Sequence, residues 1–248
     1  MKIDEKYHEV NWSLDKLQRF WDFLARDEVS QSIYFARIWG KTVLQYVRRK
    51  MTLSGKIVDC GCGTGYLLKE LLDHGFTAYG IDGSEKSIKE TVLRCKNYKN
   101  FLGAEVADLQ QLSFKDNDVD CVFLLEVLEH LDESYADCVL KEFKRVIKPG
   151  GKLIITVPND ENLDMYKVAC PECGCVFHRM QHIKSFNELK LKSLIESYGF
   201  EVLLCEQLNF SFQKNLLRRA FFKCWLFLLN LRNAPVNRPN LVCIARVK

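Results

Sequence analysis

The sequence predicts an α/β fold built around one doubly wound, mostly parallel sheet. From residue 56 to about residue 206, short β-branched runs alternate with longer segments of helical periodicity, as a parallel sheet with crossover helices requires. A length of 248 residues suits one domain with a single sizeable core. Hydrophobic residues make up 48% of the chain and charged residues 27%, which excludes a disordered or fibrous protein. The net charge of +4 does not by itself predict nucleic-acid or membrane binding.

The elements follow in order from hydrophobic periodicity and from turn residues. Strands are expected over 56–60, 78–82, 103–107, 120–125, 152–157, 201–208 and 241–247. Helices are expected over 66–74, 84–95 and 134–147. The segment 148–151 (KPGG) predicts a turn before the fifth strand, and Ser185 with Glu188 predicts a capping box that opens a helix ending near Gly199.

Three segments lie outside this alternating core. Residues 1–50 are predicted to form an N-terminal helical lid with two amphipathic helices, followed by the main domain over 51–248. Within that domain, 159–184 is a loop rich in Cys and His, and 211–240 is a helical insert before the last strand. The insert is apolar nearly all round, so we expect it to be buried, shared with a partner or in peripheral membrane contact through residues 214–231.

Cellular location is predicted from what the sequence lacks. The sequence contains no run of 18 apolar residues, so no transmembrane helix is predicted. The first twelve residues do not have the pattern of a secretory signal. Eleven cysteines in a chain of this length are interpreted as reduced thiols. A cytoplasmic protein is therefore expected, with membrane association through the insert as an alternative.

The most informative pattern is the glycine-rich segment 57–66 (IVDCGCGTGY) at a predicted strand-to-helix junction. Its alternating glycines let the backbone turn tightly and approach a ligand closely. Asp82, about twenty residues further on at the end of the second strand, is placed to accept hydrogen bonds from ribose hydroxyls. Asp59, just before the loop, would repel a pyrophosphate but suits an ammonium or a sulfonium. The pattern therefore predicts S-adenosyl-L-methionine as cofactor rather than a dinucleotide.

With these motifs, the chain resembles the class I S-adenosylmethionine-dependent methyltransferases over residues 36–206. The resemblance implies a Rossmann-like, seven-stranded sheet with an antiparallel last strand. It also implies that Asp108, after the third strand, binds the adenine amino group and that Glu126 ends the fourth strand at the active site. The implied cofactor-binding residues are Asp59, Gly61, Gly63, Gly65, Asp82, Asp108, Leu109 and Glu126.

A carboxylate–histidine group follows the fourth strand at the edge where ligands bind in such sheets. Glu126, Glu129 and His130 can converge on one divalent cation if this segment turns as a helix, and a cation there could lower the pKa of a substrate hydroxyl. The segment resembles the metal-binding stretch of the ubiquinone-type O-methyltransferases and of the small-RNA 2′-O-methyltransferases. The latter add a later histidine, whose place His182 occupies.

The predicted cation, magnesium or another divalent ion, has the ligands Glu126, Glu129, His130 and His182. The predicted catalytic residues are His182, His130 and Glu129. Two alternatives need no metal. In one, Glu126 touches the methionine part of the donor and His130 caps a helix; in the other, His182 or His130 acts as general base.

Residues 170–178 (CPECGCVFH) contain a Cys-Pro-x-Cys-Gly turn typical of a zinc knuckle. The predicted zinc ligands are Cys170, Cys173, Cys175 and His178, which leaves His182 for the active site. Such a zinc would stiffen a loop on the substrate side. A reduced, metal-free loop is the alternative.

Taken together, these motifs predict a methyltransferase that modifies an oxygen of a small or lipid-linked hydroxyl acceptor such as a quinol, a phenol or a sugar. RNA 2′-O-methylation is an alternative. A non-catalytic partner subunit that docks through the zinc knuckle is another.

Overall fold

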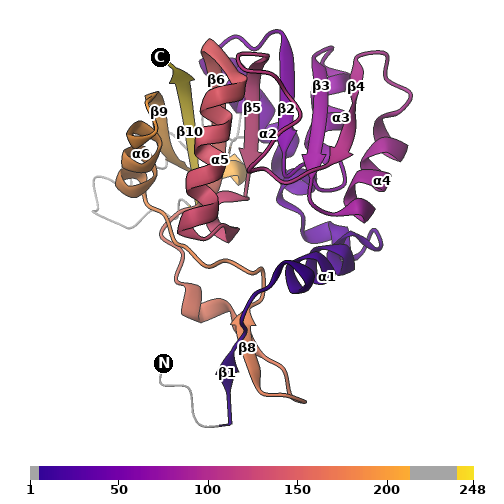
Figure 1. Cartoon of the computed structure of the whole chain (residues 1–248), viewed down its shortest axis with the longest axis vertical. Coiled ribbons are helices and arrows are strands. Elements are labelled where there is room, and N and C mark those ends of the chain that lie inside the picture. Colours follow the sequence, from indigo (N-terminus) through magenta and orange to yellow (C-terminus); the bar gives the residue numbers. More distant parts are fainter. Residues whose placement is uncertain (1–5, 213–238) are drawn as a thin grey trace.

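The computed structural model describes residues 6–212 and 239–248. Its main sheet has seven strands in the order β4–β3–β2–β5–β6–β10–β9 (Figure 1). Their bounds are β2 Lys56–Cys60, β3 Thr77–Asp82, β4 Phe101–Val106, β5 Val119–Leu125, β6 Ile147–Pro158, β9 Phe200–Leu208 and β10 Asn240–Val247. Strands β2 to β6 pair in parallel, and β10 is antiparallel to both β6 and β9. The predicted Rossmann-like sheet with an antiparallel last strand is confirmed.

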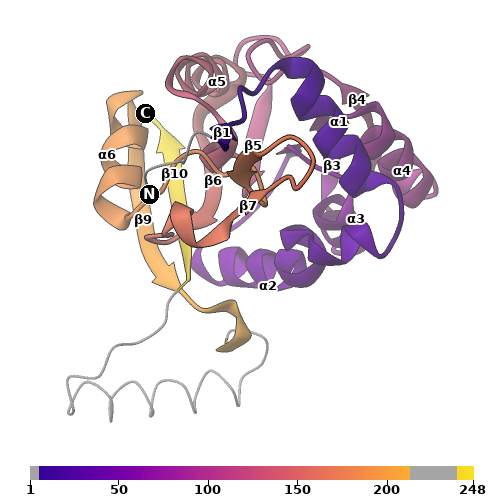
Figure 2. The same cartoon turned by 90° about the horizontal axis from the view of Figure 1, so that it is seen from below.

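Helices cover both faces of this sheet, so its central strands are buried on both sides (Figure 2). One face carries α2 Phe35–Lys50, α3 Tyr66–Asp73 and α4 Glu85–Cys95. The other face carries α5 Glu133–Val146 and α6 Glu188–Ser197. Alternate residues of β2 enter opposite cores, with Ile57 facing α3 and Val58 facing α5, as a strand period of two requires.

Two local predictions are wrong. The segment 148–151 does not form a turn before the fifth predicted strand. It lies inside β6, where the register against β5 shifts and Gly150 has φ +78°. The glycines and proline are accommodated as a bulge. Helix α6 is capped by Asn187, whose side chain accepts from the N–H of Lys190, and not by Ser185. The chain is still extended at Phe186, which bridges to Asn159, so the helix begins only afterwards.

A small three-stranded sheet, ordered β1–β8–β7, lies beneath the main sheet (Figure 1). It joins β1 His8–Glu9 to the hairpin of β7 Lys167–Ala169 and β8 Cys175–His178. Short 3-10 turns flank it, at Leu163–Tyr166 before β7 and at Leu128–His130 after β5. The sequence did not predict this sheet, because strands of two to four residues are too short to show a period of two.

The two predicted N-terminal helices have different places. Helix α1, Leu14–Ala25, lies under the same edge of the main sheet as the small sheet (Figure 1). Helix α2 instead buries Val43, Leu44 and Val47 in the core against α3, so it belongs to the layered domain. Of the predicted lid, α1 and the 3-10 turn Ser30–Ile33 cover the edge of the sheet.

Within the part of the chain that the structure describes, no helix combines the length and apolar character needed to span a membrane. Nearly all of the predicted insert at 211–240, and all of the proposed membrane contact at 214–231, lies outside the described residues.

Candidate active site

The glycine loop follows β2 and turns back over the end of β3. The N–H groups of Gly61 and Cys62 both donate to the carbonyl of Ile81, at 2.8 and 2.9 Å. Gly61 has φ +74°, and a Cβ there would stand 2.4 Å from the side chain of Val127, so no other residue fits without a shift. The loop thus keeps its backbone close to β3 and to the segment that follows β5.

Asp82 fixes this loop from the end of β3. Its Oδ2 accepts from the N–H of Gly63 at 2.8 Å, and its Oδ1 accepts from the N–H of Ser84 at 2.9 Å. Burial raises the pKa of Asp82, and the two backbone N–H groups oppose that rise. Asp82 therefore lies at the position predicted for the ribose-binding acid and also holds the loop in shape.

Asp59 is the buried carboxyl group behind the loop. Its side chain is only 2% exposed, and its Oδ2 has no hydrogen-bond partner among the described residues. Burial, with a smaller contribution from the charge of Asp82, raises the pKa of Asp59 to about 8. A cationic group bound here would stabilise the ionised carboxylate, so the site suits the positive methionine end of the predicted donor.

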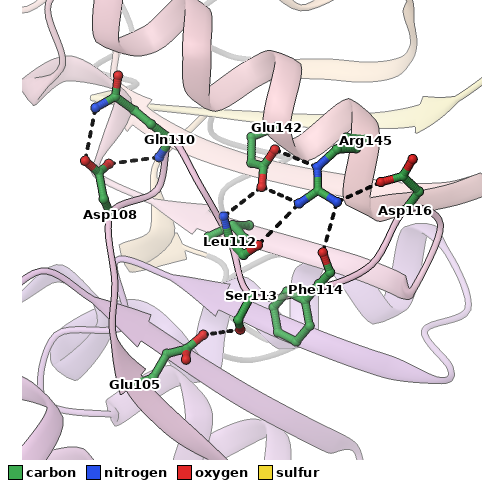
Figure 3. A network of polar contacts seen from close by, with 9 residues as sticks. All are labelled: Glu105, Asp108, Gln110, Leu112, Ser113, Phe114, Asp116, Glu142 and Arg145. Carbon is green, nitrogen blue, oxygen red and sulfur yellow. Dashed lines mark hydrogen bonds and ion pairs between the residues drawn. The ribbon is translucent and has the colours of Figure 1, made fainter.

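Asp108 lies after β4, in a segment that α5 holds in place. Figure 3 shows its Oδ1 accepting from the backbone N–H of Gln110 at 2.9 Å and its Oδ2 from the Gln110 amide at 3.1 Å. The hydroxyl of Tyr135 donates to Oδ1 as well. Partial burial pulls the pKa of Asp108 upward, but these hydrogen bonds hold it below its usual value. Leu109, the other residue predicted here, is buried in the core on the α5 face.

Arg145 of α5 fastens the chain that follows Asp108. Its guanidinium donates to the carbonyls of Leu112 and Phe114 and to the carboxylate of Asp116, while Glu142 accepts from Arg145 and from the N–H of Leu112 (Figure 3). These bonds hold the backbone from residue 112 to residue 116 against α5. They thereby anchor the segment that follows Asp108 after β4.

Helix α1 and the turn after it reach the glycine loop from the other side. Asp22 accepts from the hydroxyl of Ser84 at 2.5 Å. The buried Gln31 accepts from the hydroxyls of Thr64 and Tyr66, at 3.2 and 3.3 Å. Neither Asp22 nor Gln31 was predicted as a site residue, because a single polar residue on an amphipathic helix does not stand out in the sequence.

The carboxylate–histidine group lies at the carboxyl end of β5. Glu126 has φ +53°, so the chain leaves the strand in a left-handed conformation, and burial raises the pKa of Glu126 to about 8. Glu129 is completely buried, and neither of its carboxylate oxygens has a hydrogen-bond partner among the described residues. Burial, reinforced by the charges of Glu126 and Glu161, raises the pKa of Glu129 well above its usual value.

His130 and His182 face Glu129. Nε2 of His182 is 3.9 Å from Oε1 of Glu129, and the two imidazole rings are 4.9 Å apart between centroids. Burial is the main cause that lowers the pKa of His130 to about 3, so this ring stays neutral. Trp21 of α1 packs against the ring of His130 edge-on, with centroids 5.0 Å apart. Ligand atoms of Glu129, His130 and His182 lie within 4.8 Å of one another, and Glu126, the other predicted ligand, does not join them.

Comparison with known proteins decides the family. A model of the methyltransferase domain matches residues 14–204. This chain belongs to the S-adenosylmethionine-dependent methyltransferases. In this methyltransferase the glycine loop and Asp82, which are predicted to bind the donor, lie together at the carboxyl ends of β2 and β3.

Its relatives carry different acceptor chemistries. A ubiquinone biosynthesis O-methyltransferase of Coxiella burnetii is 31% identical over 117 residues, which is 47% of this chain and 49% of that protein. A sterol 4-C-methyltransferase of Caenorhabditis elegans is 26% identical over 204 residues, 75% of this chain and 55% of that protein. The methyltransferase thus spans about half the length of the curated relatives it matches.

Solved structures share the fold at low sequence identity. A methyltransferase from Haloferax volcanii, solved with the Trm112 activator, superposes with a TM-score of 0.65 at 18% identity, over 92% of this chain and 97% of that one. Phosphoethanolamine N-methyltransferase 2 of Haemonchus contortus, solved with S-adenosyl-L-methionine, gives 0.62 at 19% identity, over 92% and 60%. Relatives therefore include O-, C- and N-methyltransferases.

The predicted zinc site of this methyltransferase is not assembled. His178 is three residues from Cys175 in the extended strand β8, so the two side chains point to opposite faces. Cys175 stays at the hairpin turn, where the N–H of Cys170 donates to its carbonyl. His178 is instead buried beside Glu161, with its Nε2 3.5 Å from Oε1, and it stacks on His182 at 4.5 Å. The predicted turn at 170–174 does form, since the N–H of Gly174 donates to the carbonyl of Cys170 at 2.9 Å, but His178 lies away from it.

No group of three possible ligands within the described residues contains a cysteine. A zinc held by the hairpin cysteines stays a prediction that would need further ligands. Glu161, by contrast, was not predicted, and it joins His178 and His182 in a second group of potential ligands. Its place in the sequence, three residues after a strand and far from any histidine, did not indicate this.

Proposed function

We propose that this methyltransferase transfers the donor methyl to an oxygen of a hydroxyl-bearing acceptor, a quinol, a phenol or a sugar, beside a divalent cation held by Glu129, His130 and His182. The observation that carries the proposal is the carboxylate of Glu129, buried completely and without a hydrogen-bond partner among the described residues. A buried carboxylate is unfavourable unless it is paired, protonated or bound to a metal. Two imidazoles beside it supply the remaining ligands.

The residues present fit such a cation. The 3.9 Å between Nε2 of His182 and Oε1 of Glu129 is too long for a hydrogen bond and would suit two ligand atoms of one cation. His130 stays neutral, as a nitrogen ligand must. Mixed nitrogen and oxygen ligands favour zinc, manganese or iron over magnesium, which prefers oxygen alone. When bound, the cation would lower the pKa of an acceptor hydroxyl.

The chain itself positions the donor and keeps water away. Asp59 suits the positive methionine end, Asp82 the ribose and Asp108 the adenine amino group, along one edge of the sheet. Rate acceleration then comes mainly from holding the acceptor oxygen in line with the methyl group. Trp21 of α1 packs against His130 and closes the side of the site toward α1, so α1 is placed to exclude water there.

Oxygen is favoured over carbon or nitrogen because of this acid–imidazole group, and the likeness to the ubiquinone biosynthesis O-methyltransferase agrees with it. Deprotonation is the step that a hydroxyl needs before it attacks a methyl group. The same group would also serve the ribose 2′-hydroxyl of RNA, so RNA is the competing acceptor.

The proposal is tested with methyl-labelled donor, purified protein and a cell extract, with and without a chelator. Products are separated into organic-soluble and RNA fractions. We expect chelator-sensitive label in the organic phase, lost in Glu129→Gln and His182→Ala while donor binding measured by calorimetry persists. The exposed Glu133→Gln, which makes the same charge change at the start of α5, is the matched control. Label in RNA would transfer the proposal to 2′-O-methylation, and failure to bind donor would favour the non-catalytic partner.

A further inference from the structure

Glu161 and His178 surround His182 on the side away from Glu129. Glu161 lies three residues after β6, and His178 ends β8, so two separate segments bring them together. Nδ1 of His182 is 2.5 Å from Oε2 of Glu161, and Nε2 of His178 is 3.5 Å from Oε1 of the same carboxylate. One carboxylate therefore faces both imidazoles.

The backbone reveals where the proton of His178 lies. The N–H groups of Met180 and His182 both point at Nδ1 of His178, at 3.3 and 3.1 Å. A backbone N–H can only donate, so Nδ1 is the acceptor, and the ring proton of the neutral imidazole is on Nε2. His178 thus turns an N–H toward Oε1 of Glu161, although 3.5 Å is too long for a normal hydrogen bond.

The contact with Glu161 determines which ring nitrogen of His182 carries the proton. The carboxylate of Glu161 accepts in its contact with Nδ1 of His182, so Nδ1 carries the ring proton and Nε2 keeps the lone pair. That lone pair is on the side of Glu129 and His130. His130 has the matching arrangement, because its Nδ1 donates to the carbonyl of Gln181 at 3.3 Å.

The two groups of potential ligands are therefore not equivalent. Nδ1 of His182 and Oε2 of Glu161 are at hydrogen-bonding distance, which leaves no space for a cation between them, whereas Nε2 and Glu129 are separated by the wider 3.9 Å. We propose that Glu161 and His178 are positioning residues that hold His182 in the Nδ1-protonated tautomer, so that its Nε2 faces a divalent cation on Glu129 and His130. A carboxylate bound to the outer nitrogen of a metal-binding histidine is the arrangement that orients such ligands.

Backbone hydrogen bonds hold both ends of the segment that runs from Glu161 to His182. The N–H of Asp160 donates to the carbonyl of Phe186, at 2.8 Å, just before Glu161. The N–H groups of Ile183 and Lys184 donate to the carbonyl of Glu129, at 3.0 and 3.2 Å, just after His182. The positioning residues are thus built into the loop that carries the hairpin, and binding of a cation would fasten that loop to β5.

The first test needs no metal and does not depend on the proposed function. Nitrogen NMR of the imidazoles in metal-free protein, assigned with His182→Gln and His178→Gln, is expected to show His182 protonated on Nδ1 and His178 on Nε2. Glu161→Gln offers only one oxygen acceptor, so His182 should become a mixture of tautomers. His182 protonated on Nε2 in the wild type, or unchanged by Glu161→Gln, would overturn the inference.

The second test rests on the proposed cation site and uses cobalt(II), followed by its visible absorption. We expect Glu161→Gln to weaken cobalt binding by about 10- to 100-fold, as loss of such an outer carboxylate typically does, and Glu161→Asp to restore part of it. The exposed Glu172→Gln on the same loop is the charge-matched control and should bind as the wild type does. Equal binding by Glu161→Gln would refute the positioning role. Absence of cobalt binding in the wild type, with the tautomers as stated, would refute the cation and support the role of Glu161 in orienting His182.

Discussion

We expect the ligand-free protein to lose stability as the pH rises from 6.5 to 8. Burial raises the pKa values of Asp59 and Glu126 to about 8, whereas in the unfolded chain they are about 4. Between these values the folded protein holds two protons that the unfolded chain has released, so stability falls as the pH rises. The raised pKa of Glu129 acts in the same direction.

His130 sets the lower limit of the pH range in which this loss of stability is expected. The pKa of His130 is lowered to about 3 in the folded protein, against about 6.5 when unfolded, so its effect has the opposite sign but is confined to pH values below about 6.5. Above pH 6.5, each carboxyl group with a pKa raised to about 8 lowers the free energy of unfolding by about 1.6 kcal/mol between pH 6.5 and 8. For Asp59 and Glu126 together the loss is about 3 kcal/mol. For a domain of this size, that corresponds to roughly 6–12 °C in Tm.

The assay is thermal and denaturant unfolding at several pH values in chelator, without donor. Asp59→Asn keeps the shape of the side chain but removes one titrating group, so it should remove about 1.6 kcal/mol of the stability loss between pH 6.5 and 8, while the contributions of Glu126 and Glu129 remain. Saturating S-adenosylmethionine should also reduce the slope, because a positive group beside Asp59 favours its ionised form. A flat profile, a Tm that rises toward pH 8, or an unchanged slope in Asp59→Asn would contradict the raised pKa values of these buried carboxyl groups.

Three further predictions concern single residues. Glu129→Gln should reduce methyl transfer at least about 100-fold with unchanged donor affinity, and a loss of donor affinity in calorimetry would contradict this. At pH 8 the same variant should raise the Tm of the ligand-free protein, because a buried carboxyl group is removed. Asp82→Asn can accept from only one of the N–H groups of Gly63 and Ser84, so donor affinity should fall by about 10- to 100-fold, and an unchanged Kd would remove Asp82 from the donor site. Gly65→Ala places a Cβ 2.9 Å from the hydroxyl of Thr91 at φ +81°, which should lower the free energy of unfolding by about 1–3 kcal/mol; wild-type stability in urea would show that the loop can relax.

The places of the proposed donor-binding residues in the fold were predictable because each depends on a local pattern. Asp59, the loop glycines and Asp82 lie at the ends of two strands whose hydrophobic runs are unmistakable, and parallel strands bring their carboxyl ends to one edge. The strand bounds agree with the structure to within a few residues, except where β6 continues through its bulge.

Acceptor-side features depend on contacts between distant segments, which no local pattern reveals. His178 appeared to belong with the cysteines because of its spacing, but the strand β8 turns it to the opposite face, toward Glu161. Glu161 and Gln31 have no periodic or motif context, so only the folded chain shows that Glu161 lies beside His178 and His182 and that Gln31 is buried against the glycine loop. His182 was predicted from the resemblance to metal-binding relatives, and the structure does place it beside Glu129.

The Glu129–His130–His182 group is proposed to serve methyl transfer to oxygen. The most direct measurement uses donor carrying a carbon-13 methyl, with purified protein and extract, and identifies the atom that carries the methyl in the product by NMR. We expect a methoxy signal in an organic-soluble product, absent in Glu129→Gln and retained in Glu133→Gln. A methyl on nitrogen or carbon, or a methoxy product formed equally by Glu129→Gln, would contradict the claim.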